Sequence, residues 1–456
     1  MTASPAASPA AVARTVEEAY LYAYPLVLLD VIKDMATNTF EATEERAPVN
    51  QLFHARSLAT PGMVSLTRPN VDTLYSQAYL DLAAEPVLLF KPRTERYCTV
   101  QTFDGYSNTP FILGTDGLGG NDEAVYALCG PFWDGALPDG VQAVRMPTDF
   151  AWLLLRTKCF GPDDVENVHA VQDAMDTFPL SAFDDKRAGT YRPAPGAYDP
   201  ARDYVPLEYM ANLSLQDYFD RFNRLTQDNP GAAADAPALA RFAELGIGIG
   251  LAFDLQALGE DVVRATAHLP HLIDRAYSSE HAHITPSNGW MFMDERVGRF
   301  GTDYAFRAVV AYGGFANPVS MAVYPSMVMN EEGVPLRGDR AYTLHFEPNM
   351  TPPHGADGWW SLTAYTDAGR LVENELGRYN LGEVDDLPFN EDGSLDLFIQ
   401  ATNPGGRRER AWIPVCEGVF SLTMRIYLPT ATCSRSPGRC RACACAPSAQ
   451  RADPRA

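Results

Sequence analysis

The stretch TRPNVDTLYSQAYLDL, residues 67–82, decides how this chain is interpreted. Its first half gathers turn-forming and polar residues, and its second half alternates apolar and polar residues as a β-strand does. Pro69 fixes φ for a turn, and Asn70 and Asp72 carry side chains that accept hydrogen bonds from nearby backbone amides. The segment therefore predicts a tight turn that leads into a strand.

The same segment holds more polar groups than a turn requires. It offers two charges, an amide, a hydroxyl and a phenol on Arg68, Asn70, Asp72, Thr73 and Tyr75. On a strand, successive side chains alternate between faces, so Thr73 and Tyr75 share one face. Two interpretations stay open: a structural turn, or a set of side chains that surrounds a small polar ligand.

The composition is that of a globular protein with more than one domain. The chain has 456 residues, of which 46% are hydrophobic and 11% aromatic, so two to three domains are expected. The net charge of −22 argues against nucleic acid or an anionic membrane surface as partner. No signal-peptide pattern or membrane-length apolar run is present, so we expect a cytoplasmic protein without membrane insertion.

Changes in the spacing of apolar residues along the chain predict its domains. Helical spacing of apolar residues follows a lead rich in Ala, Pro and Ser, with a kink or break at Pro25. Short strand-like runs then dominate two regions on either side of a helical one, which indicates a sandwich or barrel in each β region. The expected parts are a disordered lead over 1–15, an N-terminal β-rich domain with a leading helix over 16–205, a helical connector over 206–280, a C-terminal β domain over 281–429 and a disordered Cys/Arg-rich tail over 430–456.

Cofactor motifs are weak throughout. The GIGIG run at 246–250 follows a helix and lacks the full GxGxxG pattern, so no nucleotide cofactor is predicted. His281 and His283 form an HxH pair that could bind a divalent metal together with His345. The CxxC at 440–443 has no second pair at zinc-finger spacing. The cofactor is therefore unknown, with a metal as an open alternative.

Ordered motifs along most of the chain resemble a bacterial family made of domain of unknown function 1254 followed by domain of unknown function 1214. The first domain's motifs are YPL, NxxxH, PNxDTLYS, LDL with EPVLL, and DGYSN, at 24–26, 50–54, 69–76, 80–89 and 104–108. The second domain's motifs are GTDYxxRA, ANP, YxLxF, WWSLT, N with RY, and RxYxP, at 301–308, 316–318, 342–346, 359–363, 374–379 and 425–429. The resemblance implies α+β architecture, mainly β, with two antiparallel β-sandwich or jelly-roll-like domains joined by a helical connector. It also implies a homo-oligomer, but no reaction.

We expect a small-molecule enzyme with a polar pocket at or between the two β domains, since domain interfaces favour ligand sites. The chemistry would be acid–base catalysis of hydrolase or lyase type on a small polar metabolite. The expected catalytic residues are Asp72, His54, Tyr75 and Tyr304. The expected substrate-binding residues are Arg68, Asn70, Thr73, Asp104, Tyr106, Asn108, Arg307, Asn317, Tyr324 and Arg378.

Two alternatives remain open. A non-catalytic carbohydrate- or polymer-binding protein would use an aromatic platform built from Trp290, Trp359, Trp360, Tyr365 and Tyr379. The other alternative is an oligomeric structural protein. Because neighbouring strand residues point to opposite faces, we expect one of Trp359 and Trp360 in a core and the other at a surface or interface.

Overall fold

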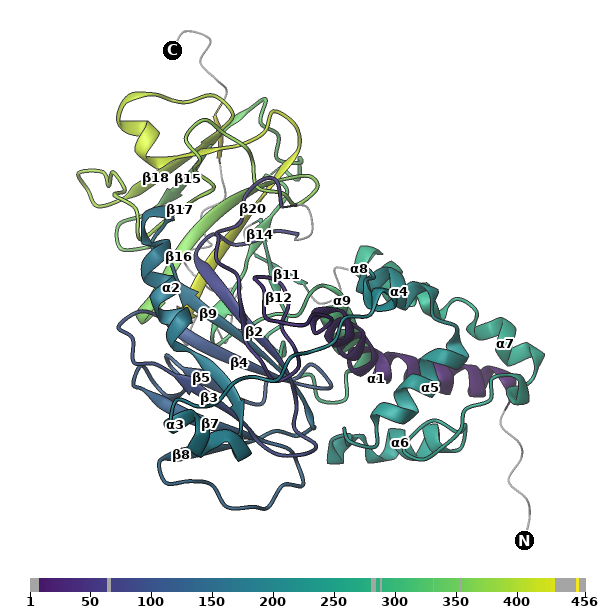
Figure 1. Ribbon diagram of the computed structural model, residues 1–456. Helices are drawn as coiled ribbons and strands as arrows, with labels where there is room; N and C mark the ends of the chain where they lie inside the picture. Colours follow the sequence, from purple (N-terminus) through teal and green to yellow (C-terminus); the bar gives the residue numbers. More distant parts are fainter. Residues whose placement is uncertain are drawn as a thin grey trace.

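The computed structural model describes residues 8–63, 67–279, 284–287, 289–330, 332–352, 354–430 and 448–450. Helix, with the 3-10 turns included, makes up 28% and strand 26% of the described residues, so the α+β class is confirmed, although strand does not predominate. Figure 1 shows a helical lobe beside two β-rich halves, the N-terminal half below and the C-terminal half above. Within the described residues, no helix is both long and apolar enough to cross a bilayer.

The helical lobe is organised around the first helix, and its members come from three parts of the chain. Its helices are α1 (Pro9–Ala36), α4 (Pro206–Asn212), α5 (Leu215–Leu225), α6 (Ala236–Ala243), α7 (Glu260–Thr266), α8 (Leu272–Ser279) and α9 (Tyr304–Tyr312). One apolar cluster joins buried residues of α1 to those of the later helices. Helix α1 therefore packs with the connector instead of serving only as a leader to the N-terminal β domain, and α9 lies within the region 281–429 that is predicted to be a β domain.

The sequence predicts a kink or a break at Pro25; helix α1 continues through that residue, so the break is wrong. Proline inside a helix removes one hydrogen bond and costs about 3 kcal/mol. Residues 22–31 are all buried, because later helices of the lobe (Figure 1) and residues of the N-terminal larger sheet both pack against this part of α1. Packing on every side offsets the cost that the local sequence predicts.

The N-terminal β half consists of two sheets that share one apolar core. The larger sheet has the order β1-β2-β9-β4-β5-β6 and the smaller β10-β3-β7-β8. Their strands are β1 (Phe53–His54), β2 (Thr73–Asp81), β3 (Val87–Lys91), β4 (Cys98–Asp104), β5 (Ile112–Gly114), β6 (Leu118–Gly119), β7 (Ala124–Cys129), β8 (Val141–Arg145), β9 (Phe150–Lys158) and β10 (Asp176–Pro179). Helices α2 (Val165–Ala174) and α3 (Phe183–Arg187) accompany them. The shared core contains residues of β2, β4 and β9 together with residues of β3, β7 and β8.

The C-terminal β half repeats this plan. Its larger sheet has the order β11-β12-β14-β20-β16-β17, with β13 also paired to β20, and its smaller sheet the order β19-β18-β15-β21. The strands are β11 (Ile284–Ser287), β12 (Trp290–Met293), β13 (Ala322–Val323), β14 (Ser326–Met327), β15 (Ala341–Phe346), β16 (His354–Thr366), β17 (Asn380–Gly382), β18 (Leu395–Gln400), β19 (Trp412–Pro414), β20 (Phe420–Pro429) and β21 (Ser448–Gln450). Another apolar cluster fills the space between these sheets.

Some details differ from the sequence-based expectations. Three strand pairs are parallel, β5 with β6, β7 with β8 and β18 with β19, so the sheets are not wholly antiparallel. Strand β21 belongs to the tail that was expected to be disordered, and it pairs with β15. His281, His283 and the CxxC at 440–443 lie outside the described residues.

The two larger sheets meet each other through their polar faces. On β16 and β20, Trp360 and Ile426 point into the C-terminal core, while Trp359 and Tyr427 point the other way, to an interface cluster that includes Tyr97 of the N-terminal half. The prediction that the two neighbouring tryptophans divide between a core and an interface is therefore confirmed. The strands β2 and β9 of one half lie beside β16 and β20 of the other (Figure 1).

Candidate functional site

The turn before β2 has the structure that its sequence predicts. Asn70 Oδ1 accepts hydrogen bonds from the backbone amides of Asp72 and Thr73, at 3.0 and 3.1 Å. Arg68 takes a left-handed backbone conformation with φ 52°, and its amide donates to Gly369 O of the C-terminal half at 2.8 Å. The turn is therefore a structural unit that is also docked on the second β domain.

The Asp72 side chain accepts hydrogen bonds from the C-terminal β half. Its Oδ2 accepts from the Ser361 hydroxyl at 2.8 Å and from the Tyr427 hydroxyl at 3.2 Å, and its Oδ1 accepts from Asn380 Nδ2 at 2.7 Å. Only 5% of Asp72 is exposed, and all three donors come from the C-terminal larger sheet. Both carboxylate oxygens are occupied by neutral donors, so the geometry suits Asp72 to hold the two domains in register.

Arg156 of β9 lies at the centre of the N-terminal polar face. It pairs in register with Tyr75 on β2 and Thr99 on β4, and 6% of it is exposed. One guanidinium nitrogen, Nη1, donates to Gln101 Oε1 at 2.8 Å, and the cation lies 5.6 Å from the centre of the Tyr75 ring. Its Nε is buried without a hydrogen-bond partner. Burial acts to lower the pKa of Arg156, and the phenols of Tyr75 and neighbouring tyrosines reverse this to a net rise.

One tyrosine from each β domain lies beside Arg156. Tyr75 accepts a hydrogen bond from Asn70 Nδ2 at 2.5 Å, and Tyr324 accepts one from Asn317 Nδ2 at 2.5 Å. The Asn70 amide orientation is fixed, because its Oδ1 already accepts from two backbone amides. Burial raises the pKa of Tyr324, with Arg156 opposing the rise. Each phenol oxygen is thus an acceptor for an amide, which leaves its own proton available for a further acceptor.

Positive charge exceeds negative charge at this interface. Arg68, Arg156, Lys158 and Arg425 lie at this interface, where Glu383 and Asp72 are the carboxylates that act on Lys158, and within the described part of the chain none of the four cations forms an ion pair. Arg425, with 4% of its surface exposed, donates only to neutral oxygens: Thr363 Oγ1, the Tyr365 hydroxyl and the Arg68 carbonyl. In a protein whose net charge is −22, this is an unusual local surplus.

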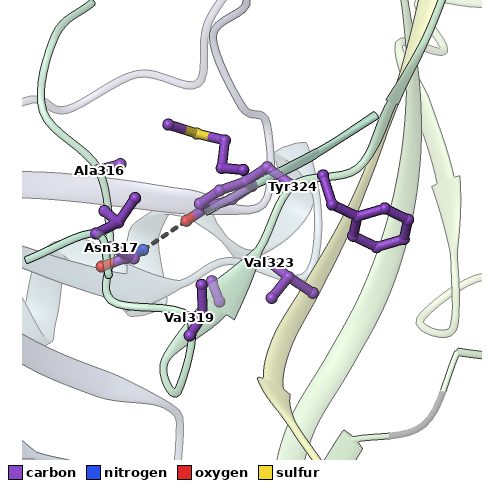
Figure 2. Close-up of a pocket in the computed structure, with 9 residues that line it drawn as sticks. Ala316, Asn317, Val319, Val323 and Tyr324 are labelled. Atoms are coloured by element: carbon purple, nitrogen blue, oxygen red, sulfur yellow. Dashed lines mark hydrogen bonds between the residues drawn. The ribbon is translucent and has the colours of Figure 1, made fainter. Parts of the chain in front are cut away.

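A small pocket reaches Tyr324 and Asn317 from the C-terminal side. It is lined mainly by apolar side chains from 292–297 and 316–324, and its free space is about 10 Å³, room for the centre of about one water molecule. Figure 2 shows the Asn317 amide and the Tyr324 hydroxyl directed toward each other beside Val319. This pocket therefore has no room for a ligand of several atoms.

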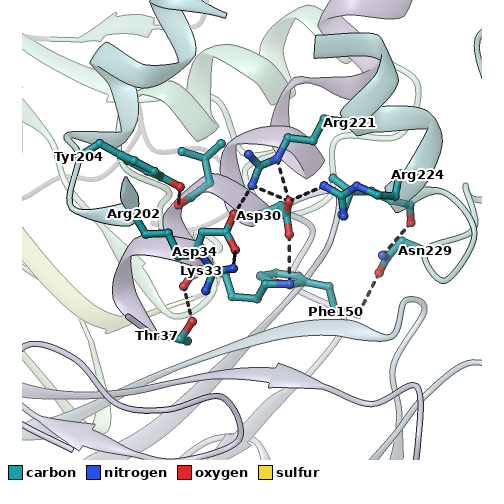
Figure 3. A network of polar contacts seen from close by, with 12 residues as sticks. Asp30, Lys33, Asp34, Thr37, Phe150, Arg202, Tyr204, Arg221, Arg224 and Asn229 are labelled. Carbon is teal, nitrogen blue, oxygen red and sulfur yellow. Dashed lines mark hydrogen bonds and ion pairs between the residues drawn. The ribbon is translucent and has the colours of Figure 1, made fainter. Parts of the chain in front are cut away.

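A charge network in the helical lobe provides a contrast. Arg221 of α5 pairs with Asp30 and Asp34 of α1, at 2.7 and 2.5 Å, and Arg202 pairs with Asp34 at 2.9 Å (Figure 3). Although burial opposes the effect, Lys33 and Arg221 hold the pKa of Asp30 below its usual value. Here each buried charge has an opposite partner, as a structural network requires.

Other expected site residues form a separate cluster where the helical lobe meets the N-terminal half. Asp104 accepts from the amides of Tyr106 and Asn108, both at 2.9 Å, and so caps its own turn. The Tyr304 hydroxyl donates to Asp235 Oδ1 at 2.9 Å. Arg307 is 2% exposed, lies 5.1–5.3 Å from three tyrosine rings and has a buried Nε without a partner. The structure therefore does not bring this group together with Asp72.

His54, Arg378 and His345 lie apart from both clusters. His54 Nδ1 is 2.7 Å from Ser76 Oγ, on the β2 face opposite Tyr75, and burial lowers the pKa of His54 to about 4. Arg378 donates to the carbonyls of residues 409 and 412. His345 Nδ1 pairs with Asp396 at 2.6 Å, which raises the pKa of that histidine. The described residues contain no group of three or more potential metal ligands.

The expected aromatic platform is not an exposed surface. Trp290, Trp359, Trp360 and Tyr365 are each at most 2% exposed. Trp359 stacks on Tyr427 with the ring centres 4.0 Å apart. These rings therefore fill cores and the domain interface.

Sequence reasoning missed the residues at the centre of the site: Tyr97, Arg156, Lys158, Ser361, Asn380, Arg425 and Tyr427. One signal was present. In FAWLLLRTK, residues 150–158, two cations stand two apart at the end of an otherwise apolar strand, which places both on one face. A charged pair within such a strand indicates a face turned toward a polar partner.

Comparisons with known families divide the chain into two regions that correspond to its N-terminal and C-terminal β halves. Residues 49–179 match the family described as "Protein of unknown function (DUF1254)", and residues 321–431 match "Protein of unknown function (DUF1214)". The chain therefore carries a DUF1254 region followed by a DUF1214 region, as its motifs predicted. No curated protein matches the chain.

Comparison with solved structures finds two matches, of which the first is similar in fold. The VPA0106 protein from Vibrio parahaemolyticus is 20% identical, with a TM-score of 0.67 over 92% of this chain and 96% of its own. A putative uncharacterized protein from Burkholderia cenocepacia is 14% identical, with a TM-score of 0.43 over 97% of this chain and 94% of its own. The first similarity extends the fold over nearly the whole chain.

Proposed function

We propose that this DUF1254–DUF1214 chain is a small-molecule enzyme that binds a compact organic anion between its two β domains. The observation that carries the proposal is Arg156, a buried guanidinium with a free Nε and no carboxylate partner among the described residues. A buried charge is costly unless it is paired. An anionic ligand would supply the missing partner.

The chemistry that suits these groups is stabilisation of negative charge and proton donation. Tyr75 and Tyr324 each have a phenol oxygen that accepts from an asparagine amide, so their protons are directed elsewhere. A raised pKa keeps Tyr324 protonated at neutral pH. Together with Arg156 these phenols would form three donors for a carboxylate or a developing oxyanion, in a site largely closed to water. The reaction would be of acid–base type, hydrolysis or elimination.

Asp72 has a positioning role in this proposal. It would align Ser361, Tyr427 and Asn380 with the N-terminal turn. The space of about 10 Å³ beside Tyr324 means that side chains or domains must move to admit a ligand of several atoms. A polar interface joined by hydrogen bonds is suited to such motion, because interfaces of this kind between domains resemble transient contacts.

The test is thermal stability in a panel of small anions, measured on wild type and on Arg156→Met. A carboxylate at 100 times its Kd should stabilise wild type by about 2.7 kcal/mol, and Arg156→Met should abolish that gain. Methionine keeps much of the side-chain volume and removes the charge. Arg307→Met is the matched control, because Arg307 is also buried among tyrosine rings with an unpartnered Nε.

Three results decide the matter. Anion stabilisation lost in Arg156→Met and retained in Arg307→Met supports the proposal. Equal stabilisation of wild type and Arg156→Met removes Arg156 from the site. No stabilisation of wild type by any small anion overturns the proposal itself.

Two finer expectations are also proposals. We infer that each β half is a sandwich-like unit, because its two sheets share one apolar core. The homo-oligomer implied by the family resemblance stays a prediction that light scattering would test.

A further inference from the structure

Lys158 is the second cation on β9, two residues beyond Arg156 and on the same face of the strand. Its Nζ lies 4.2 Å from the ring centre of Trp359 in the C-terminal half and 4.8 Å from that of Phe160. Phe160 is 53% exposed and Trp359 is 2% exposed, so the ammonium lies between the solvent and the interior of the interface. Two aromatic faces hold it in place without using its three N–H donors.

The carboxylates that influence Lys158 have other partners. Burial lowers the pKa of Lys158, while Glu383 and Asp72 oppose that effect. Asp72 accepts from three neutral donors, and Glu383 Oε2 lies 2.5 Å from His354 Nε2. No ion pair or hydrogen bond of the Lys158 ammonium occurs within the described residues. The ammonium therefore has the capacity to bind an anion.

The spacing on the strand defines what kind of anion would bind both cations. Side chains two residues apart point to the same face, with Cα atoms roughly 7 Å apart. Arg156 lies deeper and Lys158 nearer to the surface. A chain of about five or six carbons spans a comparable distance.

We propose that the ligand is a compact dianion, with one anionic group bound by Arg156, Tyr75 and Tyr324 and the other by Lys158. This inference rests on the proposed function, since it assigns the substrate class of the same site. The shared chemistry is two anionic groups on a short aliphatic chain. The second group is either a carboxylate or a phosphonate-like group, and the experiment separates these sources.

The experiment measures Kd by calorimetry for pentanoate, glutarate and 4-phosphonobutyrate. The first two share a five-carbon chain and differ in one charge. Wild type is expected to bind glutarate at least about tenfold more tightly than pentanoate, because a second charge-assisted contact is added. Lys158→Met should remove that preference and leave pentanoate binding within about twofold. Tighter, Lys158-dependent binding of 4-phosphonobutyrate also supports the dianion and assigns a phosphorylated substrate class.

Lys186→Met is the matched control, because Lys186 also lies over two rings, those of Phe178 and Tyr191, away from this interface. Lys158→Gln provides a second variant that keeps a polar end. A preference for glutarate that persists in both Lys158 variants overturns this inference and leaves the proposed function standing. Failure of wild type to bind any of the three probes overturns this inference, and the proposed function falls with it only if the wider anion panel also fails to stabilise wild type.

Discussion

Replacing Asp72 with alanine is expected to lower the free energy of unfolding by about 2–6 kcal/mol. The substitution leaves the hydroxyls of Ser361 and Tyr427 without an acceptor, and these residues are 2% and 0% exposed. Each buried donor left unsatisfied costs about 1–3 kcal/mol. Asn380 adds less, because it is only half-buried and water can replace the carboxylate. Asp72→Asn keeps the shape and an acceptor oxygen, so it should cost about 1–2 kcal/mol.

The assay is equilibrium unfolding in urea, followed by tryptophan fluorescence. Trp359 stacks on Tyr427 at the interface and therefore contributes to a signal that is sensitive to domain docking. Asp81→Ala is the matched control, because Asp81 is an exposed aspartate at the end of β2, the strand that begins directly after Asp72. Its loss should lower the free energy of unfolding by less than about 1 kcal/mol. A double-mutant cycle of Asp72→Ala with Ser361→Ala should give a coupling of about 1–3 kcal/mol.

The docking role of Asp72 is refuted if Asp72→Ala lowers the free energy of unfolding by no more than Asp81→Ala does. It is also refuted if the Asp72 and Ser361 substitutions are additive within about 0.5 kcal/mol, because residues that share a hydrogen bond must couple. Either result would mean that the two polar faces do not meet in solution as they do here.

Further predictions concern pH and packing. Because burial depresses the pKa of His54 to about 4, stability should fall as the pH drops from about 6.5 toward 4, and His54→Gln should flatten that part of a urea-unfolding pH profile. Because the pKa of Asp30 is depressed, its ionised carboxylate stabilises the fold above about pH 4, and this stabilisation is lost as the pH falls further. Asp30→Asn should lower the free energy of unfolding by about 3 kcal/mol at pH 7 and abolish that acid dependence. Gly114→Ala should reduce folded yield and thermal midpoint, because φ is +88° and the new Cβ would lie 2.2 Å from the Cys98 carbonyl oxygen.

Local sequence signals predicted the strands and turns well. The alternation after Asp72 corresponds to β2, and the Asn70 side chain caps the turn as expected. The WWSLT and RxYxP motifs fall on β16 and β20. These successes depend on periodicity and turn chemistry, which act over a few residues and are therefore visible in a single sequence.

Elements decided by distant packing were missed. Pro25 predicts a kink or a break, yet α1 continues because helices from 206–312 and the N-terminal larger sheet bury it. Helix α9 lies within 281–429, where the sequence predicts a β domain, and its apolar sequence, YAFRAVVAY, is compatible with either type over so short a length. In both cases tertiary burial outweighs local preference, and a single sequence does not show which segments meet.

The site was predicted only in part, because a single sequence does not show which segments meet. Asp72, Tyr75 and Tyr324 were identified from polar density and do lie at the domain interface. Their partners Arg156 and Arg425 were not, because nothing local distinguishes an arginine that faces another domain from one that faces water. The separation of Arg307 and His54 from Asp72 likewise depends on which strand face and which helix each residue occupies.

The contrast between the two charge networks bears on function. In the helical lobe, Arg221 lies between two carboxylates, an arrangement whose removal costs stability and which requires no ligand. At the domain interface, Arg156 has neutral neighbours only, and well-packed apolar residues in its place would often stabilise a protein. An interface that served docking alone would be expected to resemble the first arrangement or to be apolar. We therefore propose that a partner from solution pairs with Arg156. Because Arg307 is also buried with an unpartnered Nε, comparing the two variants is the most informative test of that proposal.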